Sequence, residues 1–75
     1  MAQTSFTWKS VEITSFEQLF PALLTCEDQN ELADFMNLAV LWSVEADRTR
    51  EDIFRLGGES AVHLSELYKR AINGR

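Results

Sequence analysis

The longest apolar stretch without a helix breaker runs from residue 32 to residue 46 and reads LADFMNLAVLWSVEA. At about 100° per residue, one face of a helix built from it carries Leu32, Phe35, Met36, Ala39, Trp42 and Ala46. Other apolar residues widen this face on both sides, and Leu41 lies within the remaining polar sector. A helix that is apolar around most of its circumference is buried on most sides. We therefore expect this helix to be central, with the other elements packed around it.

The start of this central helix is marked by the sequence Thr25-Cys26-Glu27-Asp28. Thr25 can cap the helix through its hydroxyl, and the acids that follow favour the positive end of the helix dipole. Asp47-Arg48-Thr49 is a break at the other end. The pattern therefore predicts a central helix over residues 26–46.

Residues 4–13, read TSFTWKSVEI, are the only β-like segment. Phe6 and Trp8 alternate on one side, and Val11 and Ile13 then alternate with the phase shifted by one residue. A lone strand cannot form a sheet, so a strand here requires a partner from another copy of the chain. The pattern favours the alternative, an extended arm over residues 1–13 that lies across the helices.

A short helix is predicted after this arm. Both Thr14 with Glu17 and Ser15 with Gln18 match the capping box, and apolar residues then recur at helical spacing at Phe16, Leu19, Phe20, Leu23 and Leu24. Pro21 removes a backbone donor inside this segment, so we expect a kink or a restart there.

The last third of the chain reads as two further short helices. Thr49 and Asp52 give a capping signal, Gly57-Gly58 predicts a stop, and Ser60 is the next cap. The inner face expected for residues 61–72 consists of Ala61, Leu64, Leu67, Tyr68 and Ala71, whereas His63, Glu66 and Arg70 point outward. The complete pattern predicts one all-α domain, residues 1–75, with an arm over 1–13 and a helical body over 14–75. That body is a small bundle of about four short helices around the central helix.

Charge is unevenly distributed along the chain. The net charge is −5, and residues 10–47 contain eight acids and no Lys or Arg, whereas most of the basic residues follow position 47. An acidic body disfavours non-specific nucleic-acid binding, which depends on phosphate contacts, and it favours attraction to basic protein surfaces.

Four acids of the central helix, Glu27, Glu31, Asp34 and Glu45, fall within one sector about 60° wide, and Leu38 and Leu41 lie in or beside it. We interpret this sector as a candidate partner-binding face with aliphatic anchors and flanking carboxylates, made of Glu27, Glu31, Asp34, Leu38, Leu41 and Glu45. The alternative is an ordinary solvated face on which Glu27 and Glu31 complement the helix dipole. Leu41 favours the binding interpretation, because a solvated face does not need it.

Candidate chemistry is sparse. Cys26 is the only cysteine and His63 the only histidine, so the sequence indicates neither a disulfide nor a zinc site, and no catalytic constellation or cofactor motif is evident. We therefore expect a protein that is not an enzyme and binds no cofactor.

A core this small often needs further support, which favours a homodimer. No apolar run is long enough for a membrane span and residues 1–10 lack the apolar segment of a secretory signal, so we expect no membrane association and a cytoplasmic location.

Residues 49–72 resemble a helix-turn-helix unit, in which the second helix enters the DNA major groove. That resemblance implies a small dimeric transcription regulator, with DNA contacts from Arg50, Arg55, His63, Lys69 and Arg70.

The leading hypothesis is different: a non-enzymatic, acidic protein-binding module that occupies a basic surface of a partner protein. Antitoxins and phage anti-defence proteins such as anti-CRISPRs are of this type. A structural or assembly subunit is the third hypothesis.

Overall fold

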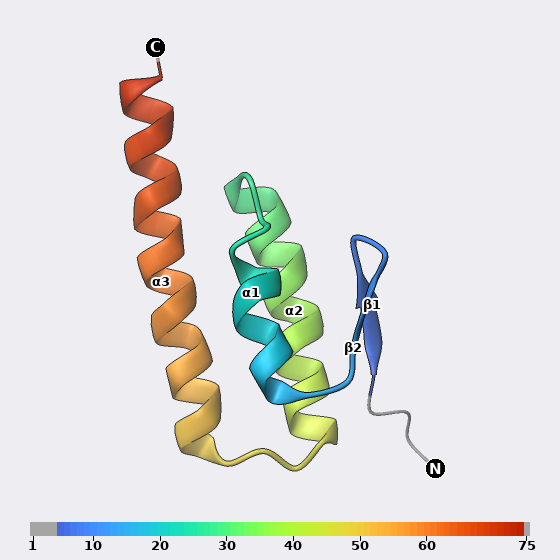
Figure 1. Ribbon diagram of the computed structural model, residues 1–75. Helices are drawn as coiled ribbons and strands as arrows, with labels where there is room; N and C mark the ends of the chain where they lie inside the picture. Colours follow the sequence, from blue (N-terminus) through green and yellow to red (C-terminus); the bar gives the residue numbers. More distant parts are fainter. Residues whose placement is uncertain (1–4, 75) are drawn as a thin grey trace.

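The computed structural model describes residues 5–74 and contains three α-helices, one 3₁₀ turn and a two-stranded antiparallel sheet within that range (Figure 1). In chain order the elements are β1 (Phe6–Trp8), β2 (Val11–Ile13), the 3₁₀ turn η1 (Phe16–Gln18), α1 (Leu19–Leu23), α2 (Gln29–Glu45) and α3 (Arg50–Asn73). The helices α2 and α3 form an antiparallel pair, and the short α1 packs against both of them.

The N-terminal segment is a β-hairpin and not the extended arm or single strand that the sequence suggested. β1 pairs with β2 in the register Phe6 to Ile13 and Trp8 to Val11. Lys9 and Ser10 form the connecting turn with φ of 48° and 69°, the positive values required by the tightest hairpin turns. The phase shift in the apolar pattern is therefore this turn, and the strand finds its partner within the same chain. Residues 1–4 of the predicted arm lie outside the described residues.

The capping box predicted at Ser15 is present. The Gln18 side-chain oxygen accepts hydrogen bonds from the backbone N–H groups of Ser15 at 2.9 Å and Thr14 at 2.7 Å. The chain then passes from the 3₁₀ turn directly into α1. Pro21 is the third residue of α1, within the first helical turn, where proline is tolerated.

Helix α2 begins at Gln29, three residues later than predicted, because its cap is Asp28 and not Thr25. The Asp28 carboxylate accepts a hydrogen bond from the Glu31 N–H at 2.8 Å. The Thr25 hydroxyl donates instead to the carbonyl of Ala22 at 2.6 Å, which closes the end of α1.

Helix α3 is continuous over 24 residues, so the predicted stop at Gly57-Gly58 and the cap at Ser60 are wrong. The cap at Thr49 is confirmed, since its hydroxyl accepts from the Asp52 N–H at 3.1 Å. Each interior glycine costs about 1 kcal/mol relative to alanine. Buried side chains on both sides of the pair, Leu56 before it and His63 and Leu67 after it, anchor the helix through this weak point. Residues 49–72 therefore contain no helix-turn-helix unit.

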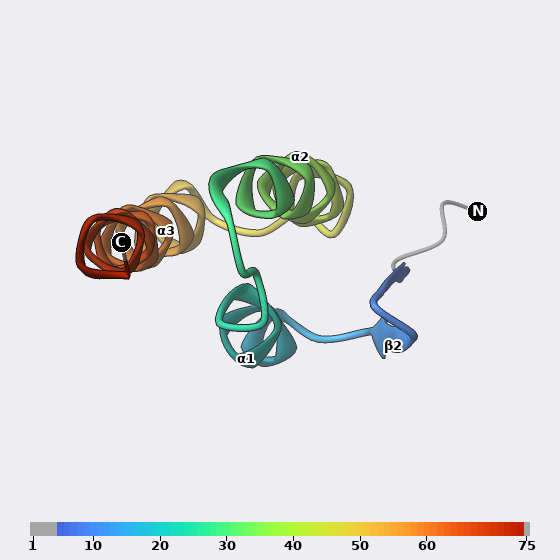
Figure 2. The same cartoon turned by 90° about the horizontal axis from the view of Figure 1, so that it is seen from above.

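The predicted bundle of four short helices around a central helix is also wrong. Helix α2 is covered by α3 along one side and by α1 and β1 along another, and it remains open on the third (Figures 1 and 2). Leu41 and Val44 on that third side are each 62% exposed. Merging the last two predicted helices into α3 leaves too few elements to surround α2.

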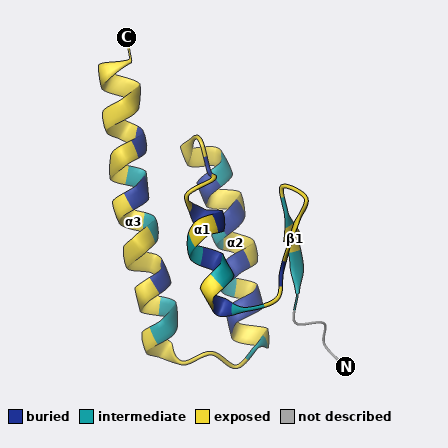
Figure 3. Cartoon of the chain, viewed as in Figure 1, coloured by how far each residue is buried: buried dark blue, intermediate teal, exposed yellow. Residues whose placement is uncertain are grey.

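The core lies where α1 meets the α2–α3 pair, and the buried positions of all three helices face this line (Figure 3). Its buried members are Ile13, Phe16, Leu19, Ala22, Leu23, Cys26, Leu32, Phe35, Ala39, Trp42, Leu56 and Leu67. Phe6 and Trp8 extend it under the hairpin, where the Trp8 ring meets Phe35 edge-on at 5.2 Å between centroids.

We expect Gly58→Ala to raise the free energy of unfolding by about 1 kcal/mol, since alanine favours helix and its Cβ would meet nothing within 4 Å. Thermal denaturation followed by circular dichroism measures the change. Gly74→Ala is the matched control and should give no gain, because its Cβ would lie 2.8 Å from the Arg70 carbonyl oxygen. A loss of stability in Gly58→Ala would contradict a continuous α3.

Candidate functional site

Four of the six residues predicted to bind a partner lie together on α2. At about 100° per residue, Asp34, Leu38, Leu41 and Glu45 fall within a sector of roughly 60°, and all four are exposed. We call these four residues the acidic face. Leu41 and Leu38 are 62% and 38% exposed, so aliphatic carbon lies in solvent between two carboxylates.

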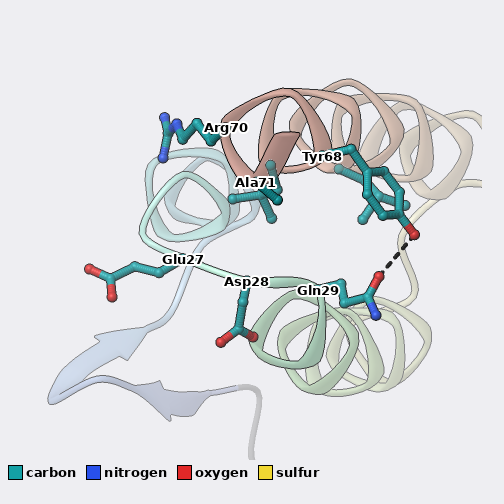
Figure 4. Close-up of a pocket in the computed structure, with 8 residues that line it drawn as sticks. Glu27, Asp28, Gln29, Tyr68, Arg70 and Ala71 are labelled. Carbon is teal, nitrogen blue, oxygen red and sulfur yellow. Dashed lines mark hydrogen bonds between the residues drawn. The ribbon is translucent and has the colours of Figure 1, made fainter. Parts of the chain in front are cut away.

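The other two predicted residues, Glu27 and Glu31, have a different position. Glu27 lies in the connection before α2, and its side chain extends away from the helices in Figure 4. The Glu31 carboxylate binds the Lys9 ammonium group at 2.7 Å and accepts the Glu27 backbone N–H at 3.0 Å. Glu31 thus joins the hairpin to α2, and its carboxylate is already engaged within the chain.

The turn of the hairpin is anchored by two hydrogen bonds to the end of α1. Lys9 donates to the Thr25 carbonyl at 2.7 Å, and the Trp8 indole N–H donates to the Thr25 hydroxyl at 3.1 Å. A mainly apolar cavity of about 260 Å³ lies between this turn and α1, lined by Trp8, Lys9, Val11, Gln18, Pro21, Ala22 and Thr25. These contacts hold a turn whose positive φ values are uncommon for residues other than glycine.

The ion pair between Lys9 and Glu31 shifts the pKa of both side chains. The hydrogen bond from Lys9, together with the backbone N–H of Glu27, lowers the pKa of Glu31 below its ordinary value of 4.5. The same hydrogen bond raises the pKa of Lys9 above 10.5. Each group therefore stays charged over a wider pH range in the folded chain.

His63, which the DNA-binding alternative placed on the outer surface, is buried at 4% exposure. Its Nε2 lies 2.8 Å from the carbonyl oxygen of Cys26. Because a carbonyl only accepts, Nε2 carries the proton and donates it. The prediction is wrong because α3 is continuous. His63 follows the buried Leu56 by seven residues, about two helical turns, so both side chains face inward. Three residues that were predicted to face inward are instead exposed: Ala61, Tyr68 and Ala71.

The four remaining residues of the DNA-binding alternative are exposed but spread around α3. The Arg55 guanidinium lies over the Phe20 ring at 4.8 Å, and Lys69 approaches Glu66 at 3.7 Å. At about 100° per residue, Arg50 and Arg70 lie on opposite sides of the helix. The structure therefore does not bring these residues onto one groove-reading surface.

Cys26 is buried, and burial, reinforced by Glu31 and Asp28, raises the pKa of its thiol to about 11, although Lys9 acts in the opposite direction. The thiol is consequently protonated near neutral pH, where only the thiolate is a strong nucleophile. Within residues 5–74, no group of three or more His, Cys, Asp and Glu side chains is placed to hold a metal ion.

A shallow depression of about 470 Å³ separates the N-terminal end of α2 from the C-terminal half of α3 (Figure 4). Its lining is Glu27, Asp28, Gln29, Leu64, Leu67, Tyr68, Arg70 and Ala71. The Tyr68 hydroxyl crosses it and donates to the Gln29 side-chain oxygen at 2.9 Å. This hydrogen bond ties the two long helices together at their open end.

The sequence interpretation missed an exposed apolar surface on α3. Phe54 and Ile72 are each 72% exposed, and Tyr68 is 53% exposed. The signal was present as seven-residue spacing between Phe54, Ala61 and Tyr68, which places them on one side of a helix. It was hidden because the expected break at Gly57-Gly58 divided the repeat between two helices.

Comparison with protein-family models, with curated proteins and with solved structures gives no match to this chain. Over the described part of the chain, no helix combines the length and the apolar character needed to cross a membrane. The function proposed below is therefore inferred from the geometry of the described residues.

We expect Lys9→Met to reduce the acid sensitivity of the fold. The lowered pKa of Glu31 stabilises the folded state above pH 4.5, the ordinary value, and this contribution is lost as the pH falls through the lowered pKa. Chemical denaturation between pH 2 and pH 7, with NMR titration of the Glu31 carboxyl, measures both quantities. An unchanged Glu31 pKa in Lys9→Met would contradict the assigned cause.

We expect His63→Leu to lower the free energy of unfolding by about 1–3 kcal/mol, because the buried Cys26 carbonyl loses its donor. Arg70→Leu, an exposed change on the same helix, should remain within about 0.5 kcal/mol of the wild type. Equal losses in the two variants would show that the hydrogen bond is not the source of the effect.

Proposed function

We propose that this chain is a non-enzymatic protein-binding module that inhibits or regulates a partner by occupying a basic surface of that partner. Antitoxins and phage anti-defence proteins are the classes that this proposal suggests. The observation that carries it is the acidic face of α2, where Leu38 and Leu41 stand exposed between Asp34 and Glu45.

The electrostatic surroundings of the acidic face support this proposal. Helix α2 contains three acids and no basic residue, and Lys9, the one base before it, is paired with Glu31. The carboxylates of Asp34 and Glu45 therefore have no basic neighbour on their own helix. Charges of this kind steer association and fix orientation, whereas the aliphatic anchors add area that is removed from water on binding.

The proposed mechanism is simple occupancy. Leu38 and Leu41 enter an apolar depression on the partner, and Asp34 and Glu45 meet the basic rim around it. A basic surface of this kind commonly serves nucleic acid, so the acidic face would compete with phosphate for the same Lys and Arg side chains. The proposed setting is the cytoplasm.

The DNA-binding alternative has lost the element that suggested it, since residues 49–72 form one helix. The proposal of a protein partner does not need that element. It places the contact on α2, whereas Arg55 of α3 lies over the Phe20 ring of α1.

Affinity capture from a host lysate tests the proposal. We expect the wild type to retain a basic protein that elutes as salt is raised, since the contact is partly between exposed charges. The variant Asp34→Lys/Leu41→Asp should lose that protein, because it reverses a charge and removes an anchor on the acidic face. Quantitative mass spectrometry of the retained proteins is the measurement.

The control variant is Glu17→Lys/Leu24→Asp, which makes the same kinds of change at exposed positions of η1 and the end of α1. It should retain the partner. Circular dichroism must show equal helicity in both variants. Retention of the partner by the α2 variant, or equal loss from both, would contradict the assignment to the acidic face.

A further inference from the structure

The α2–α3 pair has a side that no other described element covers. In Figure 2, α1 and the hairpin lie below the two long helices, and the side above them is bare. At about 100° per residue, the side opposite the α1 contacts carries Asn37 and Arg50 and six residues without a polar terminus or with an aromatic ring: Val40 and Val44 of α2 and Phe54, Gly57, Ala61 and Tyr68 of α3. We call these six residues the uncovered face. It adjoins the acidic face along α2 but contains no acidic residue.

The side chains of the uncovered face are open to solvent. Phe54 is 72%, Val44 62% and Tyr68 53% exposed, and only Val40 among the six is half-buried. Between the helices on this side runs a shallow groove of about 380 Å³, whose lining includes Ala33, Met36 and Leu64. Two parallel ridges of apolar side chains thus flank a groove that is itself largely apolar.

We propose that the uncovered face binds the same face of a second copy of this chain, giving a homodimer in which two helical hairpins form a four-helix bundle. The two-fold axis runs along the helices. Helix α2 of each copy then lies against α3 of the other in antiparallel orientation, the usual arrangement of neighbours in such bundles. This inference does not depend on the proposed inhibitor function.

The size of the face fits this occupant. Helix α2 has 17 residues, so the shared length of the pair is about 25 Å, and two helices side by side are about 20 Å wide. The footprint is on the order of 500 Å² per copy, and two copies together reach the roughly 1,000 Å² at which specific interfaces begin.

Charge selects both the occupant and its orientation. Two chains of net charge −5 repel each other, so association is least opposed on a surface without acids, and the uncovered face meets that condition. Packing α2 on α2 would set Asp34 and Glu45 of both copies against each other. Packing α2 on α3 sets them beside an edge that carries Glu51, Arg55, Glu66 and Lys69, whose two positive and two negative charges cancel.

Gly57 supplies an independent observation. A Cβ at this position would meet nothing within 4 Å, so the fold of the single chain gives no reason for glycine in the middle of a long helix. Gly57 and Ala61, one turn later, have small side chains, so the helix surface is shallow between the larger Phe54 and Tyr68. A helix of a second copy can approach closely there, as small residues allow at helix contacts.

The test is sedimentation equilibrium of the full chain over 1–200 μM. We expect the wild type to approach twice the monomer mass of 8.6 kDa. Phe54→Glu and, separately, Gly57→Leu should raise the dimer dissociation constant about tenfold or more, since one adds charge to the interface and the other fills the close approach. Leu24→Glu, at a 67% exposed position on the α1 side, is the control and should leave the constant unchanged.

Helicity measured at 1 μM distinguishes interface effects from misfolding, and Gly57→Leu should match or exceed the wild type there. Weaker dimers in Phe54→Glu and Gly57→Leu, together with an unchanged dimer in Leu24→Glu, would support the proposal. A wild type that stays monomeric at 200 μM would overturn it and leave a different protein as the occupant. Dimers that both variants leave intact would overturn it as well.

Discussion

The packing of α1 against both long helices is the interaction on which the rest of the structure depends. The five residues of α1 place Leu19 and Leu23 in contact with the core at no more than 1% exposure, and Leu56 of α3 and Phe35 of α2 are buried equally deeply. Helices α2 and α3 alone would form an open two-helix pair with exposed faces on both sides. The short helix covers one of those faces, and so it determines which face stays free.

The covered and the uncovered side of the α2–α3 pair have different proposed roles. On the covered side, the hairpin extends the core, and the bond of Lys9 to Glu31 fixes it against α2. The acidic face lies at the outer edge of α2, and the uncovered face lies opposite α1. A dimer built on the uncovered face would leave both acidic faces at its outer edges, so the two proposed contacts do not compete for the same surface.

The sequence predicted the features that depend on neighbours in the chain. The capping signals at Ser15 and Thr49 are local hydrogen bonds, and the buried side of α2 follows from helical periodicity. The hairpin was missed because its strands have three residues each and its turn lacks glycine or asparagine. The continuity of α3 was missed because glycine propensity is a weak preference that tertiary packing overrides.

The candidate site also has one part that follows from helical spacing and another that depends on contacts between distant residues. Asp34, Leu38, Leu41 and Glu45 share a face because their spacing follows the helix period, which the sequence alone displays. Glu31 belongs to the same sector by spacing, yet its carboxylate is taken by Lys9, 22 residues earlier in the chain. No local pattern reports such a contact. The inward position of His63 likewise depended on whether α3 breaks, which only the packing decides.

The hydrogen bond between His63 and Cys26 also bears on the order in which the chain folds. It joins residues 37 positions apart, whereas the hairpin, η1, α1 and the α2–α3 connection each form between near neighbours. Closing the larger loop carries a higher entropic penalty, so the local elements should form first and rapidly. Docking of the middle of α3 onto the end of α1 is then the late event. Weakening this contact should speed unfolding far more than it slows refolding.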